Sequence, residues 1–147
     1  MKVIKCCEQR LHDTAELFNN YRIFYKQEDD LDACYEFLKS NLDNNRSIIF
    51  LVIDKNDKTV AFTQLYQSFC SVEMKPICYL YDLYVDKESR GKGYSKFLMN
   101  YIIDYYKTVD IKRLTLDTAV TNTIAQNLYE SMGYKKESEF ITYHYSF

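Results

Sequence analysis

A short basic loop with two glycines is the part of the sequence best suited to hold an anion. It reads Ser89-Arg90-Gly91-Lys92-Gly93-Tyr94-Ser95-Lys96 and stands between a strand-like run ending at Val85 and a helical pattern beginning near Tyr94. The first turn of a helix presents backbone N–H groups without partners, glycines let the backbone approach a ligand, and the two basic side chains add charge. The loop is therefore predicted to bind phosphate, although an isolated Arg-Gly-x-Gly is equally compatible with an ordinary turn into a solvated helix.

The spacing of this loop does not fit two common phosphate-binding motifs. The P-loop pattern G-x-x-x-x-G-K-[ST] is absent, and the dinucleotide pattern G-x-G-x-x-G fails because Gly91-x-Gly93 is followed by Lys96 at the last position. These absences argue against a nucleoside triphosphatase and against a dinucleotide-dependent oxidoreductase.

A carboxylate lies a few residues before the loop, in the strand-like run. Asp82 is next to Leu83, and in a regularly paired strand the two side chains point to opposite faces. Burial in a sheet would raise the pKa of Asp82 toward a value useful for proton transfer. The alternative is a buried aspartate that only satisfies backbone N–H groups.

The elements that must position these residues follow from hydrophobic periodicity. Helical spacing is found over Leu11–Arg22, over Leu31–Leu42 after the acidic Glu28-Asp29-Asp30, and from Tyr94 onward. Strands are predicted at Val3–Cys7, Ser47–Asp54, Thr59–Phe69, Ile77–Val85, Arg113–Thr118 and Phe140–Phe147, and a short helix at Asn122–Ser131 is closed by Gly133. This order predicts a single α/β domain over residues 1–147, with a central, twisted, mixed and mostly antiparallel sheet flanked by helices.

Composition narrows the class of protein. The chain has 147 residues and a net charge of -2, with basic and acidic residues interspersed, which argues against a nucleic-acid or anionic-membrane partner. No apolar run approaches the ~20 residues of a membrane span, so we expect a cytoplasmic protein. Five cysteines without C-x-x-C spacing and two distant histidines predict neither a disulfide framework nor a metal site.

Several motifs together resemble the core of the GNAT N-acetyltransferases. They are Leu83-x-Val85, then Arg90-Gly91-x-Gly93, Thr118-x-x-x-Asn122, and Asn127-Leu128-Tyr129-Glu130-Ser131-x-Gly133-Tyr134, which span roughly the last half of the chain. The segments Tyr21–Gln27 and Phe62–Phe69 are similar to bacterial relatives of fungal histone and polyamine acetyltransferases. The resemblance implies the GNAT fold, acetyl-CoA as cosubstrate, no metal, and transfer of the acetyl group to an amine.

The resemblance also assigns residues to the coenzyme. Leu83, Tyr84 and Val85 match the strand whose backbone pairs with the pantetheine arm, and Asn122 matches a polar contact that could equally be a helix N-cap. Arg90 and Gly93 match the first and fourth positions of the family's loop, so that Gly91, Lys92, Gly93, Tyr94 and Ser95 would surround the pyrophosphate. Ser95 replaces the usual Gly or Ala but is small enough to leave the backbone accessible.

The catalytic groups are less completely defined. Tyr129 matches the tyrosine that many members use as general acid, protonating the departing thiolate. Many relatives carry a glutamate base four residues before the position of Leu83, where this chain has Tyr79, so we name Asp82 as the candidate base. Glu73, Tyr79, His144 or a chain of waters are the alternatives.

The resulting prediction is an acetyl-CoA-dependent N-acetyltransferase that acts on a small amine, a polyamine or an amino acid. A protein or peptide acetyltransferase and a noncatalytic acyl-CoA sensor are the alternatives. Acidic residues at Glu28, Asp29, Asp30 and Glu73 would attract a cationic acceptor or simply form a solvated face. The aromatic run Phe140–Phe147 predicts a homodimer, because an exposed apolar strand edge recruits partners.

Overall fold

The computed structural model describes residues 1–147, which form two compact units, residues 1–117 and residues 118–147. The first unit contains a five-stranded sheet in the order β1-β2-β3-β4-β5. Its strands are β1 (Lys2–Lys5), β2 (Ile48–Ile53), β3 (Thr59–Cys70), β4 (Lys75–Val85) and β5 (Leu114–Leu116). Its helices are α1 (Leu11–Phe24), α2 (Leu31–Asp43) and α3 (Tyr94–Lys107), with short 3-10 turns at Glu8–Arg10 and Lys87–Ser89.

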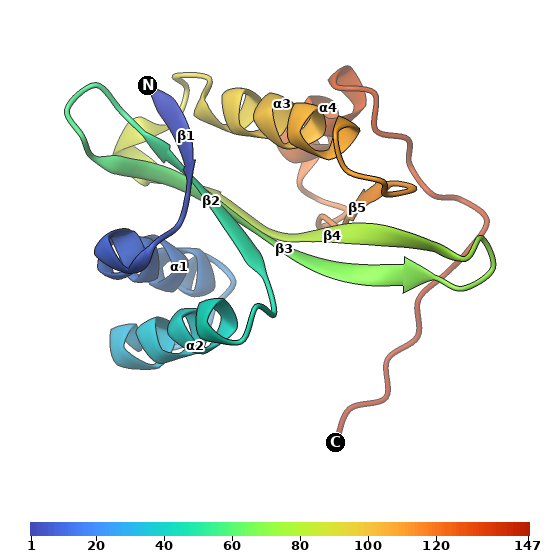
Figure 1. The fold of residues 1–147 in the computed structure, drawn as a ribbon, viewed down its shortest axis with the longest axis horizontal. Coiled ribbons are helices and arrows are strands. Elements are labelled where there is room, and N and C mark those ends of the chain that lie inside the picture. Colours follow the sequence, from blue (N-terminus) through green and yellow to red (C-terminus); the bar gives the residue numbers. More distant parts are fainter. The chain divides into compact units, whose positions relative to one another are not determined.

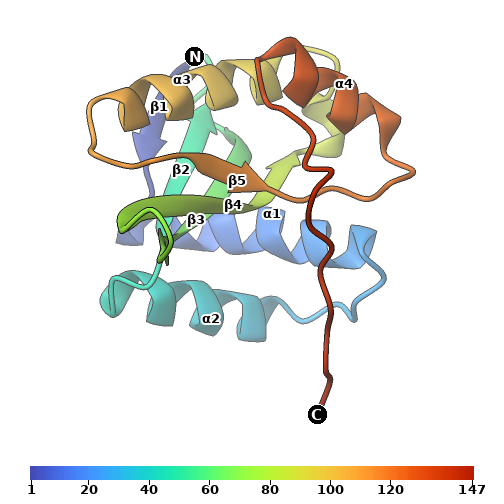
Figure 2. The same cartoon turned by 90° about the vertical axis from the view of Figure 1, so that its right-hand side faces the viewer.

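The sheet is mixed and mostly antiparallel, as predicted. Strands β1 to β4 pair antiparallel in sequence order, and only β5 runs parallel to its neighbour β4. Figures 1 and 2 show α1 and α2 on one face of the sheet and α3 on the other. The first unit is therefore a three-layer arrangement in which strand side chains are buried alternately against the two helical layers.

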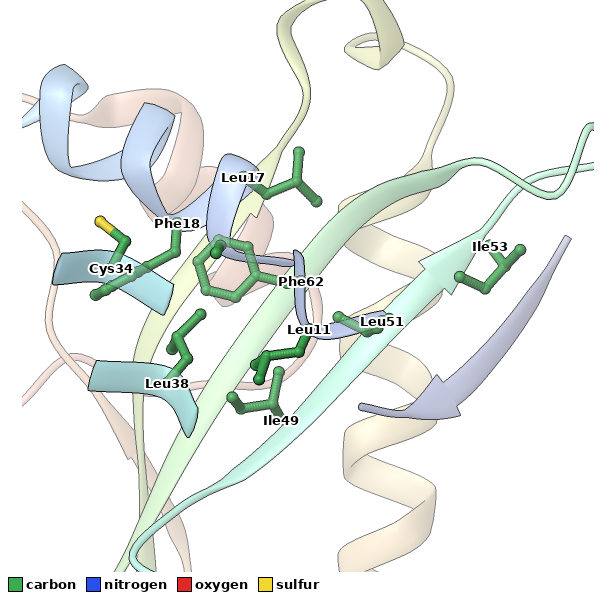
Figure 3. Packing of buried hydrophobic residues seen from close by; sticks show 10 residues of the cluster. Leu11, Leu17, Phe18, Cys34, Leu38, Ile49, Leu51, Ile53 and Phe62 are labelled. Carbon is green, nitrogen blue, oxygen red and sulfur yellow. The ribbon is translucent and has the colours of Figure 1, made fainter. Parts of the chain in front are cut away.

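Strand β2 shows how this alternation builds the core. Ile49, Leu51 and Ile53 pack with residues of α1 and α2 in one buried cluster, which Figure 3 shows together with Phe62 of β3. Phe50 points to the other face, where its ring lies 5.5 Å from that of Tyr101 and 5.2 Å from that of Tyr105 on α3. A strand buried on both sides reads as a continuous apolar run, which is why Ile48–Ile53 contains no polar residue.

The helices begin where the sequence predicted. The side chain of Asp30 accepts a hydrogen bond from the N–H of Ala33 at 3.0 Å and so caps α2, while Asn19 donates to Asp29 at 2.7 Å. The acidic segment before α2 therefore stabilises a helix terminus and a turn. All five cysteines are free thiols.

The second unit contains one helix, α4 (Thr123–Ser131). The Asn122 side chain caps it by accepting from the N–H of Ala125 at 3.1 Å, and Gly133, at φ +92°, follows its last turn. The prediction of this helix and of its closing glycine is confirmed.

The predicted last strand at Phe140–Phe147 is wrong, because residues 135–147 contain neither helix nor strand. Aromatic and β-branched side chains favour extended backbone, but a strand forms only where a second strand accepts and donates its hydrogen bonds. The second unit contains no other strand to supply that partner.

Candidate functional site

The candidate site is built around the C-terminal half of β4, where the regular sheet changes in two ways. The first is a bulge: Gln64 of β3 pairs with Asp82, but the next residue, Leu65, pairs with Leu80. Tyr81 is therefore an extra residue on β4, and its side chain is 59% exposed. Bulges bend a strand and re-aim its side chains, and they occur often beside functional sites.

The second change is that β5 separates from β4. The parallel pairing runs from Cys78↔Leu114 to Leu80↔Leu116 and ends there, whereas β4 continues to Val85. Within residues 1–117, the edge of β4 from Tyr81 to Val85 therefore has no strand beside it. An exposed backbone edge of this kind can pair with an extended ligand as a further strand would.

The direction of the backbone groups along this edge follows from one hydrogen bond. The N–H of Asp86 donates to the carbonyl of Val60 on β3 at 2.9 Å. Because backbone groups alternate in direction along a strand, those of Tyr84 face β3, while those of Leu83 and Val85 face the open edge. Two of the three predicted strand positions thus turn backbone groups toward the open edge, where the Val85 carbonyl accepts from Arg90, and Tyr84 does not.

The loop after β4 contains the predicted anion-binding elements. Gly91 and Gly93 adopt positive φ, +75° and +80°, which brings the chain into α3 at Tyr94. Gly93 is the N-cap and provides no capping side chain, and the first turn of α3 contains no acidic residue. The first N–H groups of α3 therefore keep their capacity to bind an anion, reinforced by the positive end of the helix dipole.

The two basic residues of the loop are held by neighbouring groups. The Nε of Arg90 donates to the carbonyl of Val85 at 3.2 Å, and its guanidinium lies 5.3 Å from the centre of the Tyr84 ring. Lys92 donates to the carbonyl of Glu88 at 2.9 Å. The backbone of Tyr84 faces β3, but its ring lies under the Arg90 guanidinium and so helps to hold that side chain in the loop.

Asp82 lies on the α1/α2 face of the sheet and is partly buried. Its Oδ2 accepts a hydrogen bond from the Nε2 of Gln64 at 2.8 Å. Burial raises the pKa of Asp82, and hydrogen bonds from Gln64 and Tyr21 offset part of that rise. The predicted direction of the pKa shift is confirmed, and the hydrogen bonds to the carboxylate come from side chains.

Tyrosine rings gather next to Asp82 on the same face. The ring of Tyr81 lies 5.3 Å from that of Tyr66 and 5.6 Å from that of Tyr79, the position where many relatives carry glutamate. The Tyr21 hydroxyl donates to the carbonyl of Tyr81 at 3.3 Å, so α1 contacts the bulge directly. A carboxylate beside aromatic rings is a favourable environment for a cation.

The alternative bases lie in different surroundings. Glu73 is in the turn before β4, whose first residue, Lys75, is seven positions and so about 23 Å from Asp82 along the strand. Glu73 pairs with Lys112 and Arg113, each at 3.2 Å. Its hydrogen bond from Lys112 holds its pKa below the usual range, which makes it a poor base. His144 lies in the irregular segment of the second unit.

Two predicted site residues belong to the second unit, which is described by itself. Asn122 is the N-cap of α4, and Tyr129 lies on that helix with its ring 5.9 Å from the ring of Tyr134. Their roles toward the coenzyme, and that of Tyr129 as general acid, stay predictions.

Sequence reasoning missed the buried polar residues behind Asp82. Gln64 is 0% exposed and lies on β3 between Phe62 and Tyr66, both on the α1/α2 face. A polar residue at an inward position of a strand is the signal that would have identified it, since such a group requires a buried partner.

Comparison with known proteins assigns the chain to a family. Residues 11–134 match the acetyltransferase (GNAT) family, which is most of the chain. The chain belongs to the GNAT family. That family uses acetyl-CoA as its cosubstrate. Its mixed α/β fold is the fold that the sequence predicted.

Individual GNAT relatives agree with this assignment. An uncharacterized N-acetyltransferase of Bacillus subtilis (strain 168), YhfO, is 43% identical over 129 residues, covering 88% of this chain and 86% of its own. The [ribosomal protein bS18]-alanine N-acetyltransferase of Haemophilus ducreyi (strain 35000HP / ATCC 700724) is 30% identical over 100 residues, covering 67% of this chain and 65% of its own. A crystal structure of a probable acetyltransferase superposes with a TM-score of 0.93 at 30% identity and covers 100% of this chain and 98% of its own. The resemblance to a histone and polyamine branch stays a prediction.

No helix of this GNAT protein combines the length and the apolar character that a membrane-spanning helix requires.

Proposed function

We propose that this GNAT protein transfers the acetyl group of acetyl-CoA to a primary amine by direct attack within a ternary complex. The observation that carries the proposal is the arrangement on β4. The backbone of Leu83 and Val85 faces an open edge that leads into the glycine loop, and the Asp82 carboxylate lies on a face of the same strand. Backbone donors for a thioester arm and a carboxylate for an amine are thus only one residue apart.

In this proposal the coenzyme arm extends the sheet along β4. The pantetheine amides pair with the backbone of Leu83 and Val85, and the pyrophosphate is held by the N–H groups from Gly91 to Ser95 at the start of α3. Arg90 and Lys92 supply positive charge beside the phosphates. Asn122 and Tyr129 are included on the strength of the family resemblance alone.

The proposed reaction moves one proton at each end. An acceptor that arrives as ammonium first loses one proton to water, and Asp82 takes the second proton from the nitrogen as it attacks the thioester carbonyl carbon. The backbone N–H of Leu83 or Val85 stabilises the oxyanion, the carbon–sulfur bond breaks, and the thiolate takes a proton from Tyr129. The raised pKa of Asp82 makes its carboxylate a stronger base than an exposed aspartate.

The tyrosine rings support a cationic acceptor. Tyr66 interacts with Asp82, and the ring of Tyr81, the preceding residue, lies against the rings of Tyr66 and Tyr79, so that an ammonium group at the carboxylate would have aromatic faces close by. A small amine, polyamine or amino acid is the acceptor class that we favour. A second candidate is the α-amine of a protein, which is supported by the relative named as a ribosomal-protein alanine N-acetyltransferase.

Coenzyme binding is the first test. Titration calorimetry should give one acetyl-CoA site per chain, and Arg90→Glu should weaken that binding at least tenfold because it reverses a charge beside the pyrophosphate. Lys107→Glu, a charge reversal in the last turn of the same helix, is the control and should leave the affinity unchanged. Absence of binding at millimolar acetyl-CoA would overturn the proposal.

The acceptor is the second test. Small amines, polyamines, amino acids and peptides with free N-termini are supplied together with acetyl-CoA, and released thiol is measured. Turnover with a small amine supports the favoured class, and turnover only with peptides supports the second. Tight acetyl-CoA binding without turnover on any amine would favour a noncatalytic acyl-CoA sensor instead.

A further inference from the structure

A group of fully buried polar side chains lies behind Asp82, away from the backbone edge of β4. Gln64 of β3, Asn41 of α2 and Ser47, which precedes β2, are 0%, 3% and 8% exposed. Burying an amide without a partner costs about 1–3 kcal/mol in proteins, so such groups persist only where hydrogen bonds satisfy them. Here the three side chains hydrogen-bond to one another, and Gln64 also hydrogen-bonds to Asp82, the candidate base.

The hydrogen bonds form a connected network centred on Gln64. Its Oε1 accepts from the Oγ of Ser47 at 2.7 Å and from the Nδ2 of Asn41 at 3.0 Å, and its Nε2 donates to the Oδ2 of Asp82 at 2.8 Å. The same Asn41 nitrogen also donates to the hydroxyl of Tyr66 at 3.0 Å. Both ends of the Gln64 amide are therefore engaged.

This network fixes the orientation of the Gln64 amide. If the amide were reversed, its oxygen would meet an ionised carboxylate that can only accept, and acceptor would face acceptor. The Asn41 Nδ2 would also meet a donor. Gln64, which is fully buried, therefore presents N–H to Asp82.

We propose that Gln64 is a positioning residue that holds the Asp82 carboxylate at the bulge of β4 and connects it to helix α2. This inference rests on the proposed function, in which Asp82 is the base. Gln64 pairs with Asp82 across β3 and β4 at the last regular position before Tyr81 is inserted. The hydrogen bond therefore fixes the carboxylate where the strand register changes.

The same hydrogen bond also acts on the pKa of Asp82. A donor to the carboxylate stabilises its ionised form and lowers its pKa, opposing the rise caused by burial. The other titratable groups that face Asp82 are Tyr21 from α1, which also hydrogen-bonds it, and Tyr66 from β3, while α2 contributes only the neutral Asn41. Without Gln64, the pKa of Asp82 should therefore rise further.

The decisive experiment measures this titration without any acceptor. Protein with carboxyl-¹³C aspartate is titrated by NMR, and the Asp82 signal is identified as the one lost in Asp82→Asn. Gln64→Leu should move the Asp82 midpoint upward by about one pH unit, the size of one charge-assisted hydrogen bond. The control is Gln67→Leu, an exposed position on the same strand, which should leave the midpoint unchanged.

Activity gives the second readout once an acceptor is known. The acidic limb of kcat/KM against pH should move upward in Gln64→Leu by the same amount as the NMR midpoint, while the affinity for acetyl-CoA is retained. If Gln64→Leu does not fold, Gln64→Glu replaces it. That variant keeps an acceptor for Asn41 and Ser47 and should raise the Asp82 midpoint even more, because two neighbouring carboxyls share a proton.

The outcomes separate the two proposals. An Asp82 midpoint that does not change in Gln64→Leu, or that changes equally in Gln67→Leu, overturns the role of Gln64 whatever the activity. A moved midpoint together with an unaltered acidic limb shows that Asp82 is not the base, which overturns that part of the proposed function and with it the catalytic role of Gln64. A moved midpoint and a moved limb support both.

Discussion

At the scale of single residues, the proposed chemistry depends on how environment changes ordinary side chains. Asp82 is an aspartate whose pKa is raised by burial, and Arg90 is an arginine held over the ring of Tyr84. Neither property is visible in the residue type, since the first arises from burial and the second from a ring that folding brings near.

Replacing Asp82 by Asn should lower kcat by about 10² to 10⁴, the usual contribution of a general base. In the wild type, activity should fall as pH decreases through the raised pKa, because the carboxylate becomes protonated, and this acidic limb should vanish in the variant. Because folding raises the pKa of Asp82, its ionised carboxylate costs the native state stability at a pH above that pKa, so Asp82→Asn should unfold at no lower temperature at neutral pH. Full activity with an unchanged pH profile would reassign Asp82 to the fold.

Replacing Tyr129 by Phe tests the general acid, which rests on the family resemblance. The ring keeps its packing while the phenolic proton is lost, so kcat should fall by about 10² to 10⁴ with little change in acetyl-CoA affinity. Tyr134→Phe is the control, because its ring lies 5.9 Å from that of Tyr129 in the same unit. Near-normal turnover in Tyr129→Phe would leave thiolate protonation to water.

At the scale of elements, the transition from β4 into α3 depends on backbone that only glycine adopts easily. Gly93 has φ +80°, and a Cβ added there would meet no atom within 4 Å, so Gly93→Ala introduces conformational strain without a clash. We expect a loss of about 1–2 kcal/mol in the free energy of unfolding and weaker acetyl-CoA binding, measured by denaturation and calorimetry. Gly133→Ala, at φ +92° outside this loop, should cost similar stability, and an equal loss of affinity in both variants would argue against a role of the loop.

Substitutions at Asn122 can separate two roles of this residue, capping α4 and contacting the coenzyme. Its side chain caps α4, so Asn122→Ala should lower stability by about 1 kcal/mol. Asn122→Asp restores the cap but adds a negative charge. If Asn122 also contacts the coenzyme, the Asp variant should recover its melting temperature and still bind acetyl-CoA less tightly than wild type. Wild-type affinity in the Asp variant would leave Asn122 as a cap alone.

Periodicity predicted correctly those elements whose buried face shows in the residue pattern of one continuous segment. Helix α2 shows its apolar stripe, its acidic start and its cap within 14 residues, and β2 is a continuous apolar run. The bulge at Tyr81 and the hydrogen bond from Gln64 to Asp82 could not be read in this way, because both are properties of the register between two strands. The erroneous strand at Phe140–Phe147 has the same cause, since a strand requires a partner that local preference does not specify.

At the scale of the whole molecule, the family assignment places both units within one match. The GNAT match extends from residue 11 to residue 134 and so includes the candidate site on β4 as well as α4. A single domain over residues 1–147 and a cytoplasmic location remain predictions. The aromatic C-terminal segment, Phe140–Phe147, lies wholly outside that match, so the family accounts for no role of it.

The predicted homodimer belongs to this segment. Phe140–Phe147 forms no strand, so no exposed strand edge recruits a partner there. Its large side chains are nevertheless exposed, each at least 78% accessible: Phe140, Ile141, Tyr143, Tyr145 and Phe147. Contiguous apolar surface of this kind is uncommon on monomers. Light scattering should therefore report twice the 17.6 kDa of one chain.

A variant tests whether this segment is the contact. Tyr143→Ser with Tyr145→Ser should return the protein to monomers, because two large apolar contacts are lost, and Phe69→Ser, an equally apolar change at an exposed position of the β3–β4 hairpin, should leave the dimer intact. Dimers that persist in the double variant would place the contact elsewhere on the chain. A wild-type protein that scatters only as a 17.6 kDa species at working concentration would rule out the homodimer and leave the aromatic segment available for another partner.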